Sequence, residues 1–314
     1  MQNVLLIKSG GQAAMPEWQA LFGSLLPHLD TRWWDDPSVD PNAVVYALVW
    51  QPEPGRLASY PNLRAIFSSA AGVDHIVNDP ACPKQVPVFR MLVDQTAQTV
   101  AEYVCLHALA WIRDFDRMRR AQADRRWDLF EAPRLAPETR IGIMGLGTIG
   151  QLCAGMLKAL GFQVHGWARS PKSLPGIPCA AGRDELGQFL AQSDLLVGLV
   201  PDTPETRGLV CRETIMQLPK GAAIINVARG PLVVLDDLLA ALDEGHLSAA
   251  ILDVFETEPL PATHAAWAHP KVTVTAHIAG FASREMRARK VSQNIKDLEE
   301  GTIPAGRYDA VRWY

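Results

Sequence analysis

Three segments of the sequence end an apolar, strand-like run with residues that can bind and protonate a small organic acid. Arg229 ends the run AAIINVARG, and His277 follows the run VTVTA. Between them, AAILDVFETEPLP carries Asp253, Glu256 and Glu258. A protonated imidazole can give a proton to a forming alkoxide near neutral pH, and a carboxylate beside it favours the charged ring. A guanidinium can bind a carboxylate and polarise a ketone. This set suits the reduction of a 2-keto acid, provided that a hydride donor lies next to it.

A glycine-rich loop offers a place for that donor. Gly145, Gly147 and Gly150 form GxGxxG between an apolar run and the amphipathic segment QLCAGMLKAL. In such loops the first glycine allows a tight turn, the second lets the backbone approach a pyrophosphate, and the third lets the helix lie close to the strand. The amides of Thr148 and Ile149 are then expected to point at phosphate oxygens. The strand before the loop and the helix after it favour a dinucleotide site over a glycine-rich turn without a ligand.

The residues after the next expected strand indicate which dinucleotide is bound. In most such sites an Asp or Glu about 20 residues beyond the glycines holds the ribose hydroxyls. Here the sequence reads Ala168, Arg169, Ser170, with Lys172 close by. An acid would repel a 2′-phosphate, whereas a guanidinium binds one through two hydrogen bonds. The sequence therefore predicts NADP as cofactor, with NADPH preferred over NADH; the alternative interpretation of Arg169 is a solvent-facing residue on a strand-end loop.

The elements that must position these residues alternate between strands and helices. In the second part of the chain, strands are expected at residues 140–145, 162–167, 194–200, 222–228, 247–254 and 272–276. Helical patterns separate most of them, which is typical of a doubly wound parallel sheet. Ligands of open α/β sheets lie beyond the carboxyl ends of the strands. Arg229, Asp253 and His277 are therefore expected to converge near the glycine loop.

The first part of the chain has a βαβ pattern of its own. Its expected elements are strands at residues 3–9, 44–50, 63–69 and 86–92 and a helix at residues 16–26. A helix over residues 95–127, a proline-containing linker at 131–137 and a last helix at 283–301 complete the pattern. The predicted fold class is α/β, with two Rossmann-like domains, doubly wound parallel sheets and a discontinuous first domain. We expect a substrate-binding domain at residues 1–105 and 285–314 and a dinucleotide-binding domain at 106–284.

The composition excludes several classes of protein. The 314 residues carry a net charge of −4 and are 48% hydrophobic, so nothing in the charge balance calls for nucleic acid. The arginine-rich stretch at 113–126 is interleaved with Asp and is interpreted as a solvated or subunit-contacting helix face. Five scattered cysteines predict no disulfide and no metal site, and a reducing, cytoplasmic location. No apolar run is long enough for a membrane span, and the first residues are interpreted as a strand, not a signal peptide.

Together these motifs resemble the D-isomer-specific 2-hydroxyacid dehydrogenase family, and most of all its NADP-preferring glyoxylate/hydroxypyruvate reductase branch. The resemblance runs through AAGVDH, AEYV, GLGTIG, WARS, LVPDTPETRGL, INVARGPLV, LDVFETEPLP and TAHIAGF. It implies Arg229 as the substrate-binding arginine and His277 as the acid/base. It implies Glu258, directly before Pro259, as the partner of the histidine in place of Glu256. It further implies that Asp253 bonds the nicotinamide carboxamide.

The resemblance also implies residues beyond this centre. Further cofactor contacts are expected at Val200, Pro201, Thr206, Val227, Ala228 and Gly280. In the first domain, the amides of Gly72 and Val73 are expected to bind the substrate's carboxylate, and Trp50 to cap a small substrate unless it is a core residue. His75 is interpreted as structural. Gln95 and Gln98 stand where relatives often have smaller or apolar residues, which leaves substrate size open. A homodimer is expected, formed by the arginine-rich helix and the arm after it.

Two other functions fit the same pattern. One is a dehydrogenase for a different D-2-hydroxy acid, such as 3-phosphoglycerate, although such enzymes often append a regulatory domain. The other is a dinucleotide-sensing, corepressor-like binding protein. Those proteins usually add disordered tails, whereas this chain is expected to start at its first strand and to end soon after its last helix.

Overall fold

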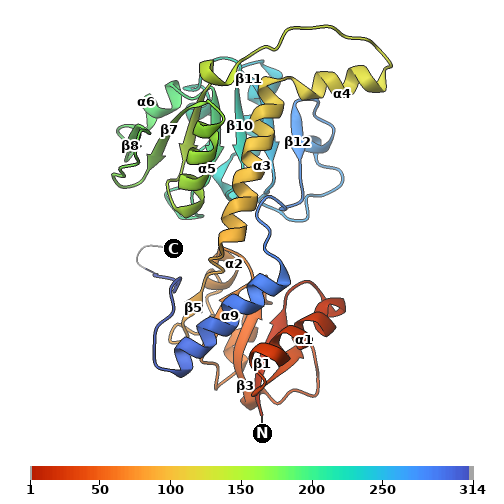
Figure 1. Cartoon of the computed structure of the whole chain (residues 1–314), viewed down its shortest axis with the longest axis vertical. Coiled ribbons are helices and arrows are strands. Elements are labelled where there is room, and N and C mark those ends of the chain that lie inside the picture. The colour runs from red at the N-terminus through yellow and green to blue at the C-terminus, as the bar shows by residue number, and fades with distance from the viewer. Residues whose placement is uncertain (1, 311–314) are drawn as a thin grey trace. The chain divides into compact units, whose positions relative to one another are not determined.

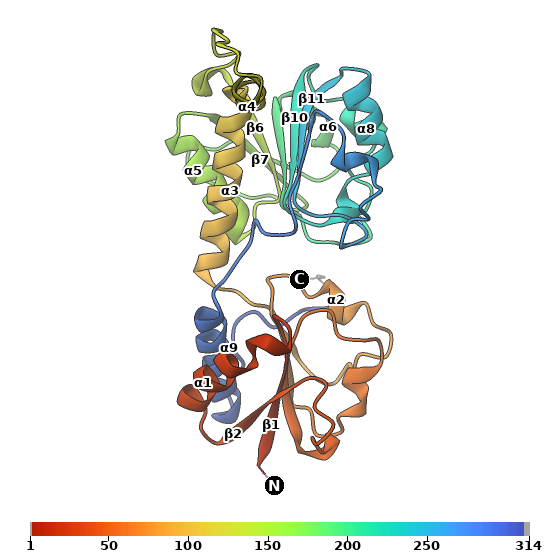
Figure 2. The same cartoon turned by 90° about the vertical axis from the view of Figure 1, so that its right-hand side faces the viewer.

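The computed structural model describes residues 2–310; the chain end expected at residues 311–314 lies outside the described residues. Contacts divide the chain into two units, shown in Figures 1 and 2. Unit 1 comprises Met1–Thr96 and Ala282–Tyr314, and unit 2 comprises Ala97–Phe281. The first unit is therefore discontinuous in sequence. The boundaries lie at 96–97 and 281–282, whereas the sequence pattern predicts 105–106 and 284–285.

Within the described residues, unit 2 is built around seven parallel strands in the order β12-β11-β10-β9-β6-β7-β8. The strands are β6 (Arg140–Met144), β7 (Gln163–Ala168), β8 (Cys179–Ala181), β9 (Leu195–Gly198), β10 (Ala222–Asn226), β11 (Leu247–Leu252) and β12 (Val272–Val274). Strands β9 and β10 are buried along their whole length, because helices cover both faces of a parallel sheet. The chain crosses the sheet between β8 and β9. The carboxyl ends of β6 and β9 therefore flank the switch point at which such sheets bind ligands.

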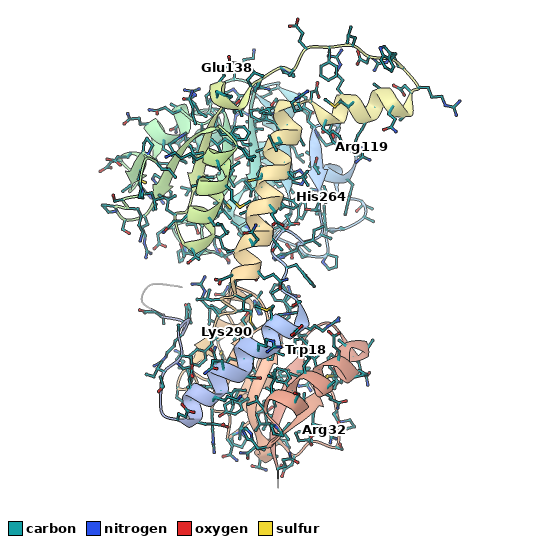
Figure 3. The ribbon with its side chains drawn as sticks, viewed as in Figure 1. Trp18, Arg32, Arg119, Glu138, His264 and Lys290 are labelled. Atoms are coloured by element: carbon teal, nitrogen blue, oxygen red, sulfur yellow. The ribbon has the colours of Figure 1, made fainter. Side chains whose placement is uncertain are left out.

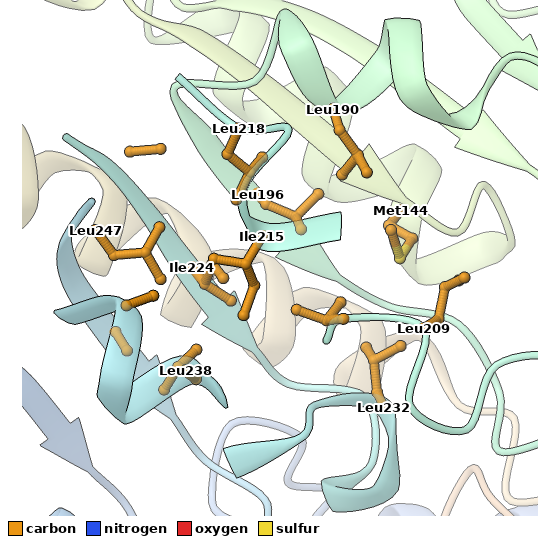
Figure 4. Close-up of a cluster of buried hydrophobic side chains, with 14 of the residues drawn as sticks. Met144, Leu190, Leu196, Leu209, Ile215, Leu218, Ile224, Leu232, Leu238 and Leu247 are labelled. Atoms are coloured by element: carbon orange, nitrogen blue, oxygen red, sulfur yellow. The ribbon is translucent and has the colours of Figure 1, made fainter. Parts of the chain in front are cut away.

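Different helices cover the two faces of this sheet. Residues 94–243 contain the helices α3 (Asp94–Ile112), α4 (Phe115–Ala123), α5 (Thr148–Ala159), α6 (Leu186–Ala191), α7 (Arg212–Ile215) and α8 (Leu235–Asp243). Figure 2 shows α3 and α5 on one face and α6 and α8 on the other. Val104 of α3 and Leu157 of α5 are fully buried against the first face. Figure 4 shows the cluster on the second face, where Ile215 and Leu238 pack on Leu196 and Ile224. Each buried side chain of this size contributes about 1.5–3 kcal/mol, so both layers hold the strand ends in place.

Unit 1 has a smaller sheet of parallel strands in the order β2-β1-β3-β4-β5. The strands are β1 (Asn3–Lys8), β2 (Leu29–Trp33), β3 (Val44–Val49), β4 (Ala65–Ser68) and β5 (Val88–Phe89), and the helices are α1 (Met15–Leu25), α2 (Asp74–Val77) and α9 (Arg284–Glu299). Trp18 of α1, labelled in Figure 3, is fully buried and donates from Nε1 to the carbonyl of Ser9 at 2.9 Å. Val291 and Ile295 of α9 join the same core. Beyond α9 the chain returns to β5, where the Tyr308 amide donates to Val88 at 2.8 Å.

The observed elements agree with the predicted alternation, with some differences. The strand predicted at residues 86–92 is limited to Val88–Phe89. The single helix predicted for residues 95–127 is two helices, because Asp114 adopts a left-handed conformation (φ 50°) between α3 and α4. Helix α4 ends at Ala123, and residues 124–135 continue without regular structure. Strands β2 and β8 are absent from the prediction. Both are short edge strands, and β8 is only half-buried, so neither has the apolar run that marks the central strands.

The described cysteines are all free thiols, and burial raises the pKa of Cys153 to about 12. No helix among residues 2–310 is long and apolar enough to cross a membrane. In the same part of the chain, no group of three or more His, Cys, Asp or Glu side chains is arranged to hold a metal ion.

Candidate active site

The glycine loop has the shape that a dinucleotide phosphate requires. Gly145 follows β6 with φ 114°, and a Cβ there would lie 2.6 Å from the Leu199 carbonyl oxygen. A Cβ on Gly150 would lie 1.8 Å from the carbonyl oxygen of Gly145. At Gly147, by contrast, no heavy atom of residues 2–310 outside the adjoining backbone lies within 4 Å of an added Cβ. Gly145 therefore lets the loop pack against the segment after β9, Gly150 lets α5 pack against the loop itself, and Gly147 leaves open space at the N-terminus of α5.

The surroundings of this open space also fit a dinucleotide. Thr148 is exposed and Ile149 half-buried in the first turn of α5, whose N-cap, Gly147, has no side chain to cap the amides. The N-terminus of a helix attracts anions through these amides. The expected cofactor residues Val200 and Pro201 follow β9, and the Thr206 hydroxyl donates to the Pro201 carbonyl at 2.7 Å. These residues fit a nicotinamide dinucleotide with its phosphates at the loop.

The end of β7 has cationic and hydroxyl side chains in place of a carboxylate. Ala168 is buried as the last residue of the strand, and Arg169, Ser170 and Lys172 follow it, all exposed. Because no acid follows the strand directly, a ribose phosphate meets no repulsion from these residues. The local geometry thus suits the 2′-phosphate of NADP.

His277 and Glu258 form a hydrogen-bonded pair beyond the ends of β12 and β11. Nδ1 of His277 lies 2.8 Å from Oε2 of Glu258, and the two side chains are 28% and 24% exposed. The other carboxylate oxygen accepts the Phe255 amide at 2.9 Å. Glu256 is exposed and takes no part in the pair.

The electrostatics of this pair favour a charged carboxylate. Burial raises the pKa of Glu258, but the hydrogen bonds from His277 and the Phe255 amide lower it, and the charges of His277 and Arg229 lower it further. The net result is a pKa below the ordinary value for Glu. Glu258 is therefore ionised near neutral pH. Because it contacts Nδ1 of the imidazole, Nε2 is the ring nitrogen that faces away from Glu258.

Arg229 reaches the same place from the end of β10. Its backbone is fixed by Asn226, whose side-chain amide donates to the Arg229 carbonyl at 3.0 Å. The next residue, Gly230, is buried, and a Cβ there would lie 1.9 Å from the backbone of Phe255. This close approach brings the segment after β10 against the segment that carries Glu258. The structure thus brings together the three residues Arg229, Glu258 and His277.

Asp253 ties the turn at His277 to the end of β11. His277 has φ 54°, and its amide donates to the Asp253 carbonyl at 2.8 Å. The Asp253 carboxylate, 2% exposed, accepts the amides of Ile278 and Ala279, each at 2.9 Å, and the Thr275 hydroxyl at 2.5 Å. The Tyr103 hydroxyl of α3 lies 2.7 Å from that of Thr275. Non-glycine residues rarely adopt a positive φ, so this buried network stabilises an unusual turn.

The remaining expected cofactor residues lie at neighbouring strand ends. Val227 and Ala228 follow β10, and the Ala228 amide donates to the Asn226 side chain at 3.1 Å. Gly280 is exposed, shortly after the His277 turn.

The residues expected from the first domain lie together at the ends of β3 and β4 in unit 1. Trp50 is half-buried, outside the core, and its ring centroid lies 4.4 Å from that of His75 on α2. The carbonyl of Gly72 accepts the Ser68 hydroxyl at 2.7 Å, and Val73, 5% exposed, precedes α2. The loop that was expected to bind a carboxylate is therefore fixed by its own hydrogen bonds.

Sequence reasoning misses three residues with a place in or near this site. Tyr103 and Thr275 complete the Asp253 network, and Arg183 follows the unpredicted strand β8. Tyr103 lies in the recognised motif AEYV, which gives no sign of what its hydroxyl contacts. Arg183 is visible only once β8 is known to lie beside β7.

The sequence and fold are similar to those of proteins with known names. Residues 105–279 match the family model described as "D-isomer specific 2-hydroxyacid dehydrogenase, NAD binding domain". The chain is 39% identical over 306 residues to glyoxylate/hydroxypyruvate reductase A of Serratia proteamaculans, which covers 95% of this chain and 96% of the relative. It is 37% identical over 303 residues to the protein of the same name from Yersinia enterocolitica.

Solved structures with a similar fold include cofactor complexes. A D-isomer-specific 2-hydroxyacid dehydrogenase from Xanthobacter autotrophicus, in complex with NADPH and MES, has a TM-score of 0.92 and 39% identity over the full length of both chains. An NADPH-dependent glyoxylate/hydroxypyruvate reductase from Sinorhizobium meliloti, in complex with NADP and sulfate, has a TM-score of 0.92 and 31% identity, covering 99% of this chain and 100% of the other.

Proposed function

The chain belongs to the D-isomer-specific 2-hydroxyacid dehydrogenase family, and from that premise we propose that it reduces the small 2-keto acids glyoxylate and hydroxypyruvate with NADPH. It is an oxidoreductase that uses a nicotinamide dinucleotide. The observation that carries the proposal is the His277–Glu258 pair, 2.8 Å apart, beside Arg229 in the unit that holds the glycine loop. When bound, the dinucleotide supplies the hydride.

In this proposal each residue of the trio has one task. His277 gives a proton from Nε2 to the oxygen that was the ketone, since Nδ1 faces Glu258. Glu258 fixes the ring and stabilises its charged form. Arg229 binds the substrate's carboxylate and polarises its ketone, because a planar guanidinium matches both oxygens. Asp253 keeps the His277 turn in place and has lone pairs left on Oδ2 for the carboxamide of the cofactor.

Residues of unit 1 complete the assignment of substrate contacts. The amides of Gly72 and Val73 bind the carboxylate, and Trp50 restricts the size of the substrate side chain. Its partly exposed ring supports this role over that of a core residue. Glyoxylate and hydroxypyruvate are small enough for such a restriction, and phenylpyruvate is not.

A homodimer is part of the same proposal. Residues 124–135 leave the body of unit 2 beyond α4, as Figure 1 shows. Trp127 and Leu129 on this arm are 96% and 89% exposed. Large apolar side chains that are exposed in contiguous patches commonly mark interfaces. Asp128 between them accepts two hydrogen bonds from Arg117, at 2.7 and 2.8 Å, which fixes the arm to α4. Sedimentation of the wild type against a Trp127→Ser, Leu129→Ser double variant measures the dimer directly.

The function is tested by initial rates with glyoxylate, hydroxypyruvate, pyruvate and phenylpyruvate, each with NADPH and with NADH. We expect the highest kcat/KM for glyoxylate or hydroxypyruvate with NADPH, at least about tenfold above NADH, as one charged contact implies. The His277→Asn variant from the same preparation controls for contaminating activity. Equal rates with both cofactors would contradict the NADPH preference, and a preference for phenylpyruvate would contradict the role of Trp50.

A further inference from the structure

The carboxyl ends of β7 and β8 lie side by side at one edge of the larger sheet. Ala168, the last residue of β7, is paired with Ala181, the last residue of β8. The Gly182 amide donates to the Ala168 carbonyl at 3.0 Å, and Trp167 Nε1 donates to the Gly182 carbonyl at 2.7 Å. These bonds fix the point at which the chain leaves each strand. One exposed arginine follows each of these two strand ends: Arg169 after β7 and, two residues beyond Ala181, Arg183 after β8.

A carboxylate from a third strand end lies within the electrostatic reach of both arginines. Glu205 belongs to the segment after β9, which Thr206 holds together by accepting the Thr203 amide at 2.9 Å. The Thr203 hydroxyl and the Glu205 amide lower the pKa of the Glu205 carboxyl, and the positive charges of Arg169 and Arg183 lower it further. The Glu205 carboxylate thus interacts electrostatically with both arginines, and the pairing of Ala168 with Ala181 brings the chain segments of the two arginines to the same edge of the sheet.

We propose that Arg183 is a second cation of the subsite for the adenosine 2′-phosphate, acting together with Arg169, and that Glu205 opposes binding of that phosphate. This inference rests on the proposed use of NADPH. A phosphate monoester carries nearly two negative charges and three strong acceptor oxygens, so one guanidinium does not saturate it. Because Glu205 is an anion that interacts electrostatically with the same two arginines, it repels the phosphate and competes for them. Arg183 therefore sets the strength of the preference for NADPH, and Glu205 limits it.

The test uses two ligands that differ only in the 2′-phosphate: adenosine 2′,5′-bisphosphate and AMP. Each is titrated calorimetrically into the full-length protein at fixed ionic strength, without substrate or turnover. The variants are Arg183→Gln, Arg169→Gln and Glu205→Gln. The control is Arg119→Gln, which removes the same charge from α4, where Figure 3 labels the side chain. Unfolding temperatures of all variants check that each is folded.

For Arg183→Gln we expect the Kd of the bisphosphate to rise about tenfold, the scale of one charge-assisted hydrogen bond at an exposed site. The Kd of AMP stays within about twofold. Glu205→Gln should change the bisphosphate affinity in the opposite direction, by about threefold, because a surface charge pair contributes less. The Arg119→Gln control should change neither value.

The outcomes separate this inference from the proposed function. If the wild type prefers the bisphosphate and Arg169→Gln loses the preference while Arg183→Gln keeps it, the NADPH proposal stands and the assignment of Arg183 is wrong. Equal loss of both ligands in Arg183→Gln also overturns the assignment, because the residue would then not act on the 2′-phosphate. If the wild type itself does not distinguish the two ligands, both the NADPH preference and the inference fall.

Discussion

Replacing Gly147 by Ala separates cofactor binding from folding. The backbone at Gly147 has φ −76°, which alanine adopts without strain, and among the described residues an added Cβ meets no atom within 4 Å apart from the adjoining backbone. The methyl group instead enters the space assigned to the pyrophosphate. The free protein should therefore fold normally, and only the complex with the dinucleotide should suffer.

The expected magnitude follows from these contacts. An inserted methyl group in a filled site costs about 1–3 kcal/mol, which is about a 5- to 150-fold rise in the Kd of NADPH. In the free protein, losing the glycine N-cap lowers the free energy of unfolding, and the smaller conformational freedom of alanine in the unfolded chain raises it. The two effects oppose each other, so the free energy of unfolding should change by no more than about 1 kcal/mol.

The matched comparison is Gly150→Ala, in the same loop. Its Cβ would lie 1.8 Å from the carbonyl oxygen of Gly145, a backbone atom that cannot move without opening the loop. We expect this variant to lose about 2–4 kcal/mol of unfolding free energy. Urea unfolding of the free protein and fluorescence titration with NADPH measure both quantities. A Gly147→Ala variant that binds NADPH within twofold of the wild type would refute the placement of the phosphates.

Four further predictions concern the residues around His277. His277→Asn should lower kcat by about 10²-fold or more in steady-state assays, because the proton donor is lost while the fold is kept. The pKa of Glu258 lies below its ordinary value, so Glu258→Gln removes a full negative charge from beside His277, and the basic limb of the pH profile of kcat/KM should move to lower pH. An unchanged basic limb would show that another acid is the partner of His277. Arg229→Lys should raise the KM of the keto acid more than it lowers kcat, since a point charge replaces a planar fork. Tyr103→Phe should lower the free energy of unfolding by about 1 kcal/mol through its lost bond to Thr275 and reduce kcat only a few-fold; an unaltered urea midpoint would show that the bond contributes nothing.

The sequence predicts those site residues that directly follow the apolar strands of a parallel sheet. The central strand β10 is a continuous apolar run because both of its faces are covered, and its end marks Arg229. His277 follows the edge strand β12, which is half-buried but still has valines at both of its ends. The GxGxxG spacing places the phosphate loop, because the turn and the close helix both require glycine. The edge strands β2 and β8 lack an apolar run of this kind: β2 contains Asp30, Thr31 and Arg32, and β8 is three small residues. The position of Arg183 could not be predicted either, because it is known only once β8 is placed beside β7.

Other features depend on contacts that no local pattern records. The break at Asp114 lies within a stretch that remains helical in composition on both sides, so only the left-handed backbone at that residue reveals it. The spacing alone does not choose between Glu256 and Glu258 as the partner of His277. The choice depends on how the chain turns after β11, where Gly230 lets it approach the segment that carries Arg229.

The strand order divides the larger sheet into two functional halves. The residues assigned to chemistry follow β10, β11 and β12, whereas those assigned to cofactor choice follow β7, β8 and β9 and, with the glycine loop after β6, lie consecutively in residues 140–206. Selection can therefore act on the two properties independently. A chimera that receives residues 140–206 from an NAD-preferring relative should change its cofactor while keeping its substrate. The topology thus makes cofactor preference an exchangeable module, which metabolic engineers could transplant as one uninterrupted gene segment.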